Sequence, residues 1–193
     1  MGLEINADIP LLIMITRLTH QKGIDLFLHI AHELLESKIQ AVVLGSGDYE
    51  YEKKLKNIEY QYANFKAIIK FDRALSRKLY AAADIFLMPS KFEPCGLSQM
   101  TACSYGAVPI VRLVGGLYDT IKPYESEESN GFGFYNYNAH EFLFEIKKAL
   151  NIYEKNKSKW NEILKRCMKS KFTWGNSAKM YVSIYKKLGE FNG

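Results

Sequence analysis

Short apolar runs alternate with amphipathic stretches along most of the 193 residues, and this alternation constrains the fold more than any other feature. The run Leu11–Ile15 is apolar throughout, as expected of a strand that is buried on both faces of a sheet. The stretch from Ile24 to Ser37 instead repeats its apolar side chains at helical spacing. Strands separated by crossover helices favour a parallel sheet, so the sequence predicts a single α/β domain with a doubly wound sheet.

The same periodicities, with turn and cap residues, predict the remaining elements. Further strands are expected over residues 40–44, 66–71, 85–88 and 109–111. Further helices are expected over residues 49–62, 75–82, 96–105, 138–153, 158–170 and 176–187. Ser76 is expected at an N-cap, and Asn138 with Glu141 three residues later is typical of a capping box. The acidic segment 123–131 predicts a surface loop without core residues, with a lid over a ligand as the alternative.

Composition excludes some classes of partner. Lys and Arg exceed Asp and Glu by five, which suits an anionic ligand. The lysines are scattered and no nucleic-acid motif is present, so no nucleic-acid partner is expected. No apolar run approaches membrane-spanning length and no signal segment begins the sequence, so no membrane association is expected. Three irregularly spaced cysteines argue against a disulfide framework and favour a reduced, cytoplasmic setting.

The segment Lys91–Gln99 follows an apolar strand and opens onto a predicted helix. Backbone N–H groups of Gly96, Leu97 and Ser98 would stand unpaired at the positive end of that helix, which favours phosphate. Glu93 suits a sugar, because hydroxyl groups donate hydrogen bonds to a carboxylate. Together these features predict a nucleotide-sugar site, and a purely structural turn is the alternative.

A second polar loop, residues 16–23, follows the strand Leu11–Ile15 and carries two cations, Arg17 and Lys22. A planar guanidinium and a compact ammonium together suit a diphosphate. Two solvated loop cations are the alternative interpretation. Open α/β sheets bind ligands at the carboxyl ends of their strands, and this position favours a binding role.

Two other ligand classes lack support in the sequence. No glycine-rich loop follows the first strand, and Gly45-x-Gly47 meets Glu50 where a third glycine of a dinucleotide fingerprint would lie. His29 and His32 have a spacing that suits a metal, but no third ligand is evident. Neither a dinucleotide nor a metal is therefore predicted.

Taken together, the motifs resemble the carboxy-terminal domain of bacterial glycogen synthases and plant starch synthases, which are retaining glucosyltransferases of the GT-B fold. The resemblance covers almost the whole chain and rests on the order and spacing of several segments. They are Arg-Leu-x-x-Gln-Lys-Gly at 17–23, Leu-Gly-x-Gly-Asp at 44–48, Pro-Ser-Lys-Phe-Glu-Pro-Cys-Gly-Leu at 89–97, Tyr-Gly-x-x-Pro at 105–109, Gly-Gly-Leu-x-Asp-Thr at 115–120 and Phe-Thr-Trp at 172–174.

The resemblance implies that residues 1–193 form one nucleotide-sugar-binding domain, a Rossmann-like sheet that is the C-terminal half of a GT-B fold. Residues 1–9 resemble the linker from an N-terminal domain. The helix within residues 172–193 would cross back onto that domain. Because the active site of such an enzyme lies between the two domains, the isolated chain is expected to be inactive.

The resemblance also implies roles for individual residues. Arg17 and Lys22 match cations that hold the donor diphosphate and stabilise the leaving group, and Glu93 matches the carboxylate that binds the transferred glucose. Phe71 falls where the family has an aromatic that packs on adenine, with a core position as the alternative. Cys95 is interpreted from its place in the segment as a residue that packs within the site or positions its backbone. The donor-binding positions besides Phe71 are Cys95, Gly96, Leu97, Ser98, Gly115 and Gly116.

The implied reaction transfers glucose from ADP-glucose to the non-reducing end of an α-1,4-glucan with retention of configuration. No cofactor or metal is expected, because Arg17 and Lys22 would supply the charge stabilisation that a metal otherwise provides. The implied partners are ADP or ADP-glucose, and the glucan through the N-terminal domain, in the cytoplasm or in a plant plastid. Two alternatives stay open: another retaining GT-B glycosyltransferase with a different donor or acceptor, and a non-catalytic nucleotide-sugar-binding module.

Overall fold

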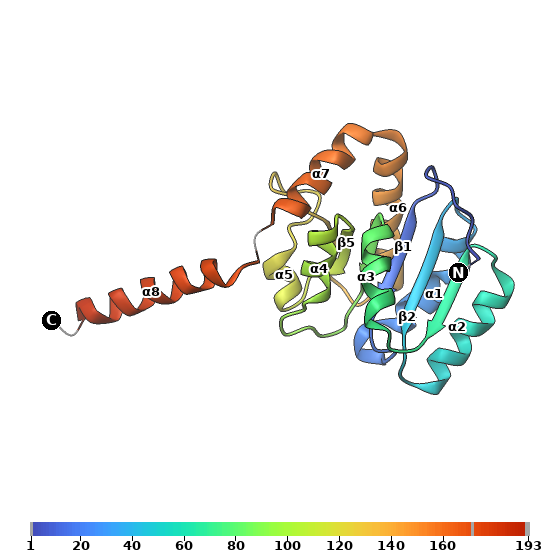
Figure 1. Ribbon diagram of the computed structural model, residues 1–193, viewed down its shortest axis with the longest axis horizontal. Helices are drawn as coiled ribbons and strands as arrows, with labels where there is room; N and C mark the ends of the chain where they lie inside the picture. Colours follow the sequence, from blue (N-terminus) through green and yellow to red (C-terminus); the bar gives the residue numbers. More distant parts are fainter. Residues whose placement is uncertain (1, 171, 192–193) are drawn as a thin grey trace.

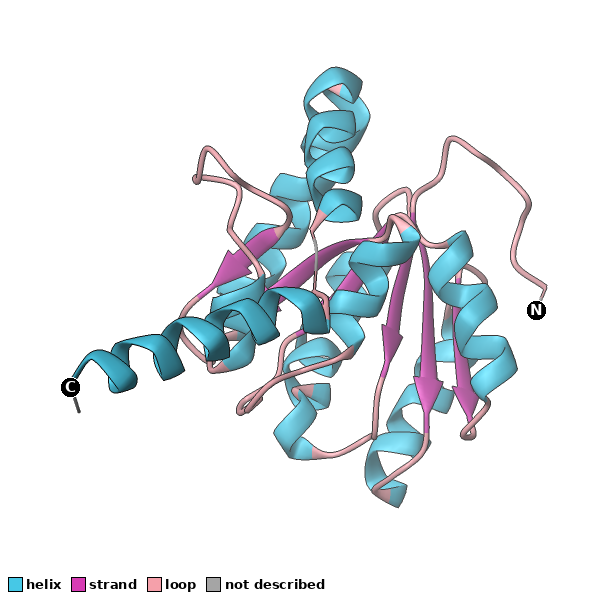
Figure 2. Cartoon of the chain, turned by 60° about the vertical axis from the view of Figure 1, so that its left-hand side comes forward, coloured by secondary structure: helices cyan, strands magenta, loops and turns pink. Residues whose placement is uncertain are grey.

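A parallel sheet forms the centre of the computed structural model, which describes residues 2–170 and 172–191 (Figure 2). Its six strands lie in the order β3-β2-β1-β4-β5-β6, and each neighbouring pair is parallel. The strands are Leu11–Ile15 (β1), Gln40–Gly45 (β2), Phe65–Ile69 (β3), Ile85–Met88 (β4), Val108–Arg112 (β5) and Phe132–Phe134 (β6). The order reverses between β1 and β4, so the sheet is doubly wound and the predicted fold class is confirmed.

Helices cover both faces of the sheet. They are η1 (His20–Lys22, a 3₁₀ turn), α1 (Ile24–Leu35), α2 (Tyr49–Gln61), α3 (Arg73–Ala82), α4 (Ser98–Tyr105), α5 (Gly116–Thr120), α6 (Ala139–Lys155), α7 (Lys157–Lys169) and α8 (Trp174–Phe191). Side chains of β1 alternate between two hydrophobic clusters, with Leu12 and Met14 in one and Ile13 in the other. The first cluster contains α1, α2 and α6, and the second contains α3, α4 and α5.

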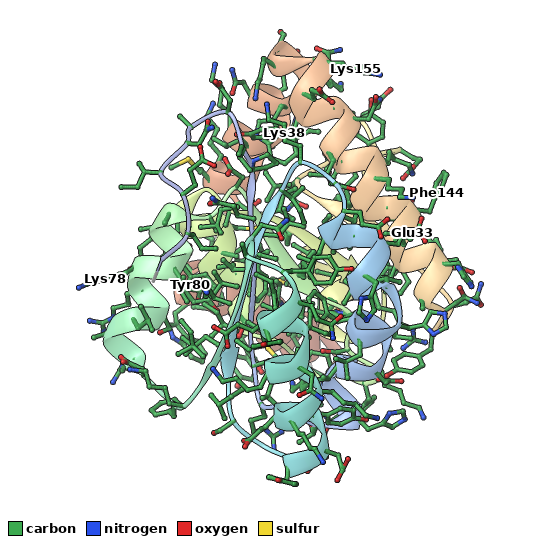
Figure 3. All side chains as sticks on the ribbon, turned by 90° about the vertical axis from the view of Figure 1, so that its right-hand side faces the viewer. Glu33, Lys38, Lys78, Tyr80, Phe144 and Lys155 are labelled. Carbon is green, nitrogen blue, oxygen red and sulfur yellow. The ribbon has the colours of Figure 1, made fainter. Side chains whose placement is uncertain are left out.

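Surface helices carry one buried and one solvated face, as their periodicity predicts. On α3, Tyr80 points into the body of the molecule while Lys78 points away into solvent (Figure 3). On α1, Glu33 lies beside α6, where it forms an ion pair with Lys147 (Figure 3). Phe144 of α6 remains exposed on the outer side of its helix (Figure 3).

Several predicted boundaries are wrong for identifiable reasons. Strand β3 ends at Ile69, and Phe71 lies in the following loop. Helix α3 begins at Arg73, because the Asp72 side chain caps it by accepting a hydrogen bond from a backbone N–H in its first turn. Ser76 is therefore inside the helix, where its hydroxyl donates to the Arg73 carbonyl oxygen at 2.9 Å. Strand β6 and the short helix α5 are absent from the sequence prediction.

The N-cap predicted at Asn138 is confirmed, and its side chain accepts hydrogen bonds from the backbone N–H groups of His140 and Glu141. The reciprocal half of the capping box differs from the prediction. The Glu141 carboxylate accepts hydrogen bonds from the backbone and side chain of Asn136, two residues before the cap. Helix α6 is thus anchored to the segment that leaves β6.

The segment 123–131 is a loop, but the prediction that it lacks core residues is wrong. Asn130 is buried, and its side chain accepts a hydrogen bond from Lys122 N and donates to Thr120 O and Ser170 Oγ. Tyr124 stacks on Phe132 with ring centroids 5.4 Å apart. These contacts anchor both ends of the loop to the domain.

Helix α8 extends away from the rest of the chain (Figure 1). It begins two residues before the predicted start at 176 and continues beyond the predicted end at 187. Its exposed apolar side chains include Trp174, Met180, Tyr181, Ile184, Tyr185 and Leu188. The outer ends of the predicted segments 1–9 and 172–193, at Met1 and at residues 192–193, lie outside the described residues.

Within the described ranges 2–170 and 172–191, no helix combines the length and apolarity needed to cross a lipid bilayer.

Candidate functional site

The two polar loops predicted to bind a ligand leave adjacent strands at the reversal of strand order, β1 and β4. They are joined by backbone contacts: Lys91 N donates to Gln21 O at 2.8 Å, and the Gln21 side chain donates to Phe92 O at 3.2 Å. Gly23 permits this approach, because its φ is 73° and a Cβ there would lie 2.1 Å from Pro89 O. The topology therefore brings the two sequence motifs together into one site.

Lys22 and Glu93 form a largely buried ion pair at the centre of this site. Lys22 Nζ lies 2.5 Å from Glu93 Oε2, and the two side chains are 14% and 10% exposed. The Ser90 hydroxyl donates to the same carboxylate oxygen at 3.3 Å. No described residue donates a hydrogen bond to Glu93 Oε1, so this oxygen is available to a ligand.

Arg17 is exposed at the start of the first loop, and none of the described residues forms an ion pair with its guanidinium. It lines two neighbouring cavities of about 180 and 250 Å³. Both cavities are also lined by Ile15, Thr16 and Ser98. Lys22 also lines the smaller cavity, which we call the cationic compartment. Phe71 also lines the larger cavity, so an aromatic ring lies next to the cationic compartment.

Phe71 is 89% exposed. The alternative that it belongs to the hydrophobic core is therefore wrong. Its position at the mouth of the larger cavity results from the early end of β3 at Ile69 and from the cap at Asp72, which starts α3 one residue later.

The start of α4 has the open N–H groups that the sequence predicts. Leu97 occupies the N-cap position and supplies no side-chain hydrogen bond to the helix. Among the described residues, no group accepts a hydrogen bond from the backbone N–H of Gly96, Leu97 or Ser98. These three donors lie beside the cationic compartment, because Ser98 lines the same cavity as Lys22. Such a helix start suits an anion.

Gly115 and Gly116 pack directly against the loop that carries Glu93. A Cβ at Gly115 would lie 2.2 Å from Glu93 O, and one at Gly116 would lie 2.1 Å from Cys95 O. Gly116 N also donates to Glu93 O at 3.1 Å. The close approach of two backbones explains both glycines, and a direct ligand contact from them stays a prediction.

The other predicted donor-binding residues surround the same helix start. Cys95 is exposed, and Leu97 is 72% exposed. The Thr101 hydroxyl, one turn further along α4, donates to Leu97 O at 3.0 Å and is thereby directed at its own helix.

Sequence reasoning missed Ser90, Gln99 and Thr120. Ser90 is 1% exposed and donates a hydrogen bond to Glu93. Because the two residues lie only three positions apart, their contact could have been predicted from the sequence. Gln99 is fully buried although glutamine is usually exposed, and its hydrogen bond to Thr120 spans 21 positions. No local pattern reports a contact of that range.

A larger cavity of about 470 Å³ lies at the opposite end of the sheet, where Pro10 and Ile39 precede β1 and β2. None of the residues that line this cavity belongs to the loops that follow the strands. In the described part of the chain, no group of three or more His, Cys, Asp or Glu side chains could hold a metal ion.

Fold and site together define a doubly wound α/β domain with a polar site where the strand order reverses. The chain belongs to the family described as glycosyl transferases group 1, whose model matches residues 2–165.

Within that family the chain is similar to glycogen synthases. It is 51% identical over 191 residues to the glycogen synthase of Clostridium botulinum (strain Eklund 17B / Type B), and 49% identical over 192 residues to that of Bacillus subtilis (strain 168). Each match covers 97% of this chain. The chain spans only 40% of the length of these relatives.

A solved structure of a related enzyme also matches this chain. The catalytic domain of starch synthase IV from Arabidopsis thaliana, bound to ADP and acarbose, matches with a TM-score of 0.87 and 37% identity. The match covers 96% of this chain and 40% of that one. The resemblance to glycogen and starch synthases predicted from the motifs is thereby confirmed.

Proposed function

We propose that this chain is the nucleotide-sugar-binding domain of a glycogen or starch synthase and that it binds ADP-glucose. The observation that carries the proposal is the arrangement of Arg17, the Lys22–Glu93 pair and the open start of α4 around one cavity. The similarity to a starch synthase structure bound to ADP supports the choice of nucleotide.

The donor diphosphate would lie between the cationic loop and the start of α4. Arg17 offers a planar fork for bidentate hydrogen bonds, and Lys22 offers a point charge. Negative charge grows on the leaving nucleoside diphosphate as the glycosidic bond breaks. Fixed cations and backbone N–H groups stabilise that charge in the transition state, which is electrostatic catalysis.

The glucose would contact Glu93. Lys22 and Ser90 both hold Oε2, which fixes the carboxylate and leaves Oε1 to accept a hydrogen bond from a sugar hydroxyl. The base would lie in the larger cavity, where the exposed ring of Phe71 offers a flat surface for stacking. Diphosphate, sugar and base would thus occupy adjoining parts of one site.

The whole enzyme would transfer glucose to the non-reducing end of an α-1,4-glucan with retention, in the cytoplasm and without a metal. An N-terminal domain would complete the cleft and bind most of the glucan. Helix α8, with its exposed apolar side chains, would pack on that domain. The isolated chain would bind the donor and transfer no glucose.

Calorimetric titration with ADP, ADP-glucose, UDP and UDP-glucose tests the proposal. We expect binding of the adenine nucleotides and its loss in Arg17→Ala. Lys38→Ala is the matched control, because it removes one exposed positive charge beside the cavity at the opposite end of the sheet. Preference for uridine nucleotides would refute the proposed donor, and unchanged binding in Arg17→Ala would refute the proposed site.

Glucose transfer to glycogen, measured with labelled ADP-glucose, tests the remaining part. No transfer is expected from the isolated chain. Sustained elongation by the purified chain would contradict the requirement for an N-terminal domain.

A further inference from the structure

We propose that Gln99 is a positioning residue of the donor site, and this inference rests on the proposed function. Its side-chain amide holds carbonyl groups of the 93–97 loop towards the interior. The backbone N–H groups of Gly96 and Leu97 consequently face the ligand, where they bind the donor phosphate.

The Gln99 side chain is fully buried, and its amide nitrogen has three hydrogen-bond partners. Its Nε2 lies 2.9 Å from Gly96 O, 3.3 Å from Cys95 O and 3.1 Å from Thr120 Oγ1. Two of these partners are carbonyl oxygens, which only accept, so the nitrogen of the amide must face them. The Thr120 hydroxyl donates to Gly116 O at 2.7 Å and is thereby oriented to accept from Gln99.

Peptide geometry converts these contacts into a direction for the N–H groups. The chain has no cis peptide bond among the described residues, so each C=O points opposite to the N–H of the next residue. Because Cys95 O is held towards Gln99, the Gly96 N–H points away from it. Because Gly96 O is held in the same way, the Leu97 N–H also points away, and neither N–H has an acceptor within the described residues.

Gly96 is the point of closest contact. Its φ is 75°, and a Cβ there would lie 2.5 Å from Gln99 Oε1. The Gln99 amide therefore packs directly on the glycine, where no side chain fits.

The carbonyl of Glu93 is held on the other side of the loop by Gly116 N at 3.1 Å. Gly116 also accepts the hydrogen bond from Thr120, so Gln99, Thr120 and Gly116 form one connected support. A carbonyl that rotated towards the ligand would place a partial negative charge against the phosphate. The support prevents that rotation.

The two ends of the Gln99 amide differ in their hydrogen bonding. Its Oε1 is buried without a hydrogen-bond partner, which is an unfavourable state for a polar atom. An apolar side chain of similar size would avoid this penalty but would release the two carbonyls. The amide nitrogen thus satisfies acceptors that an apolar side chain would leave without a partner.

Gln99→Met tests the inference, with affinities for ADP and adenosine measured by NMR chemical-shift titration. We expect the ADP affinity to fall about tenfold, because the phosphate loses roughly one charge-assisted hydrogen bond. Adenosine affinity should stay within twofold, because adenosine has no phosphate. Gln40→Met is the matched control: Gln40 is a buried glutamine that donates to Glu4 O at 2.8 Å far from the site, and its loss should change neither affinity.

Two variants at Thr120 test the positioning role independently, should Gln99→Met fail to fold. Thr120→Val removes the hydroxyl and should weaken ADP binding severalfold, whereas Thr120→Ser retains it and should bind like the wild type. Equal losses of ADP and adenosine affinity, or folded variants with unchanged ADP affinity, would overturn the positioning role. A wild-type chain that binds neither ligand would overturn the proposed function and this inference with it.

Discussion

The ion pair between Lys22 and Glu93 should couple the two motif loops energetically, and a double-mutant cycle measures this coupling. The cycle compares the wild type with Lys22→Met, Glu93→Gln and the double variant. Met and Gln keep most of the side-chain volume, so the cycle changes charge more than packing. Free energies of unfolding from urea titrations supply the four corners.

The expected magnitude follows from the geometry. Two unit charges 2.5 Å apart attract by about 7 kcal/mol at an effective dielectric constant of 20. Desolvation of two side chains that are 14% and 10% exposed offsets most of this attraction. Removal of one partner leaves the other charge buried and should cost about 3 kcal/mol, at the lower end of the range for buried pairs. The double variant leaves neither charge behind, so its loss should be smaller than the sum by at least about 1 kcal/mol.

Urea titrations followed by circular dichroism resolve such differences when the slope of the transition is unchanged between variants. Each single variant should unfold at a urea concentration about 1.5 M lower than the wild type, at a slope of about 2 kcal/mol per molar urea. Additive losses, within about 0.5 kcal/mol, would show that the two side chains do not stabilise one another. The ion pair would then be excluded as a link between the loops.

Three further changes test other parts of the structure. Gly116→Ala should destabilise the domain by about 2 kcal/mol in thermal melts, because its Cβ would lie 2.1 Å from Cys95 O. Gly189→Ala is the control and should not destabilise the domain, because open space surrounds Gly189. Burial raises the pKa of Asp84, whose carboxylate accepts from Leu11 N, so its ionisation opposes folding. The stability of Asp84→Asn relative to the wild type should therefore rise with pH from about 4, and a pH-independent difference in urea titrations would refute this. Iodoacetamide should modify only Cys95 in the native chain, since the other two thiols are buried, and ADP should slow the reaction; equal labelling of all three cysteines by mass spectrometry would contradict the structure.

The sheet was predictable because its signals are local. Strands β1, β2 and β4 are buried on both faces and therefore read as continuous apolar runs. The predictions failed where local signals compete or are weak. Ser76 and Asp72 are both good N-caps, and only the observed end of β3 decides between them. Strand β6 has three residues, too few to show a period.

The site residues likewise include some that local sequence signals predict and one that they leave undecided. The sequence predicted a site at Arg17, Lys22 and Glu93 from their places after apolar strands, and the order of strands brings the two loops that carry them together. It left the position of Phe71 undecided, because an aromatic at the end of a strand is equally consistent with the core and with a ligand surface. Its exposure excludes the core position, and its contact with a ligand stays a prediction.

By itself, the sequence determined the fold class and indicated the two polar loops after β1 and β4, because periodicity and capping depend on residues a few positions apart. Only the tertiary structure decided how the site is held together. Lys22 meets Glu93 across 71 positions, and Gln99 meets Thr120 across 21. Contacts at such separations depend on how strands and crossover helices pack, and a linear pattern carries no record of that packing.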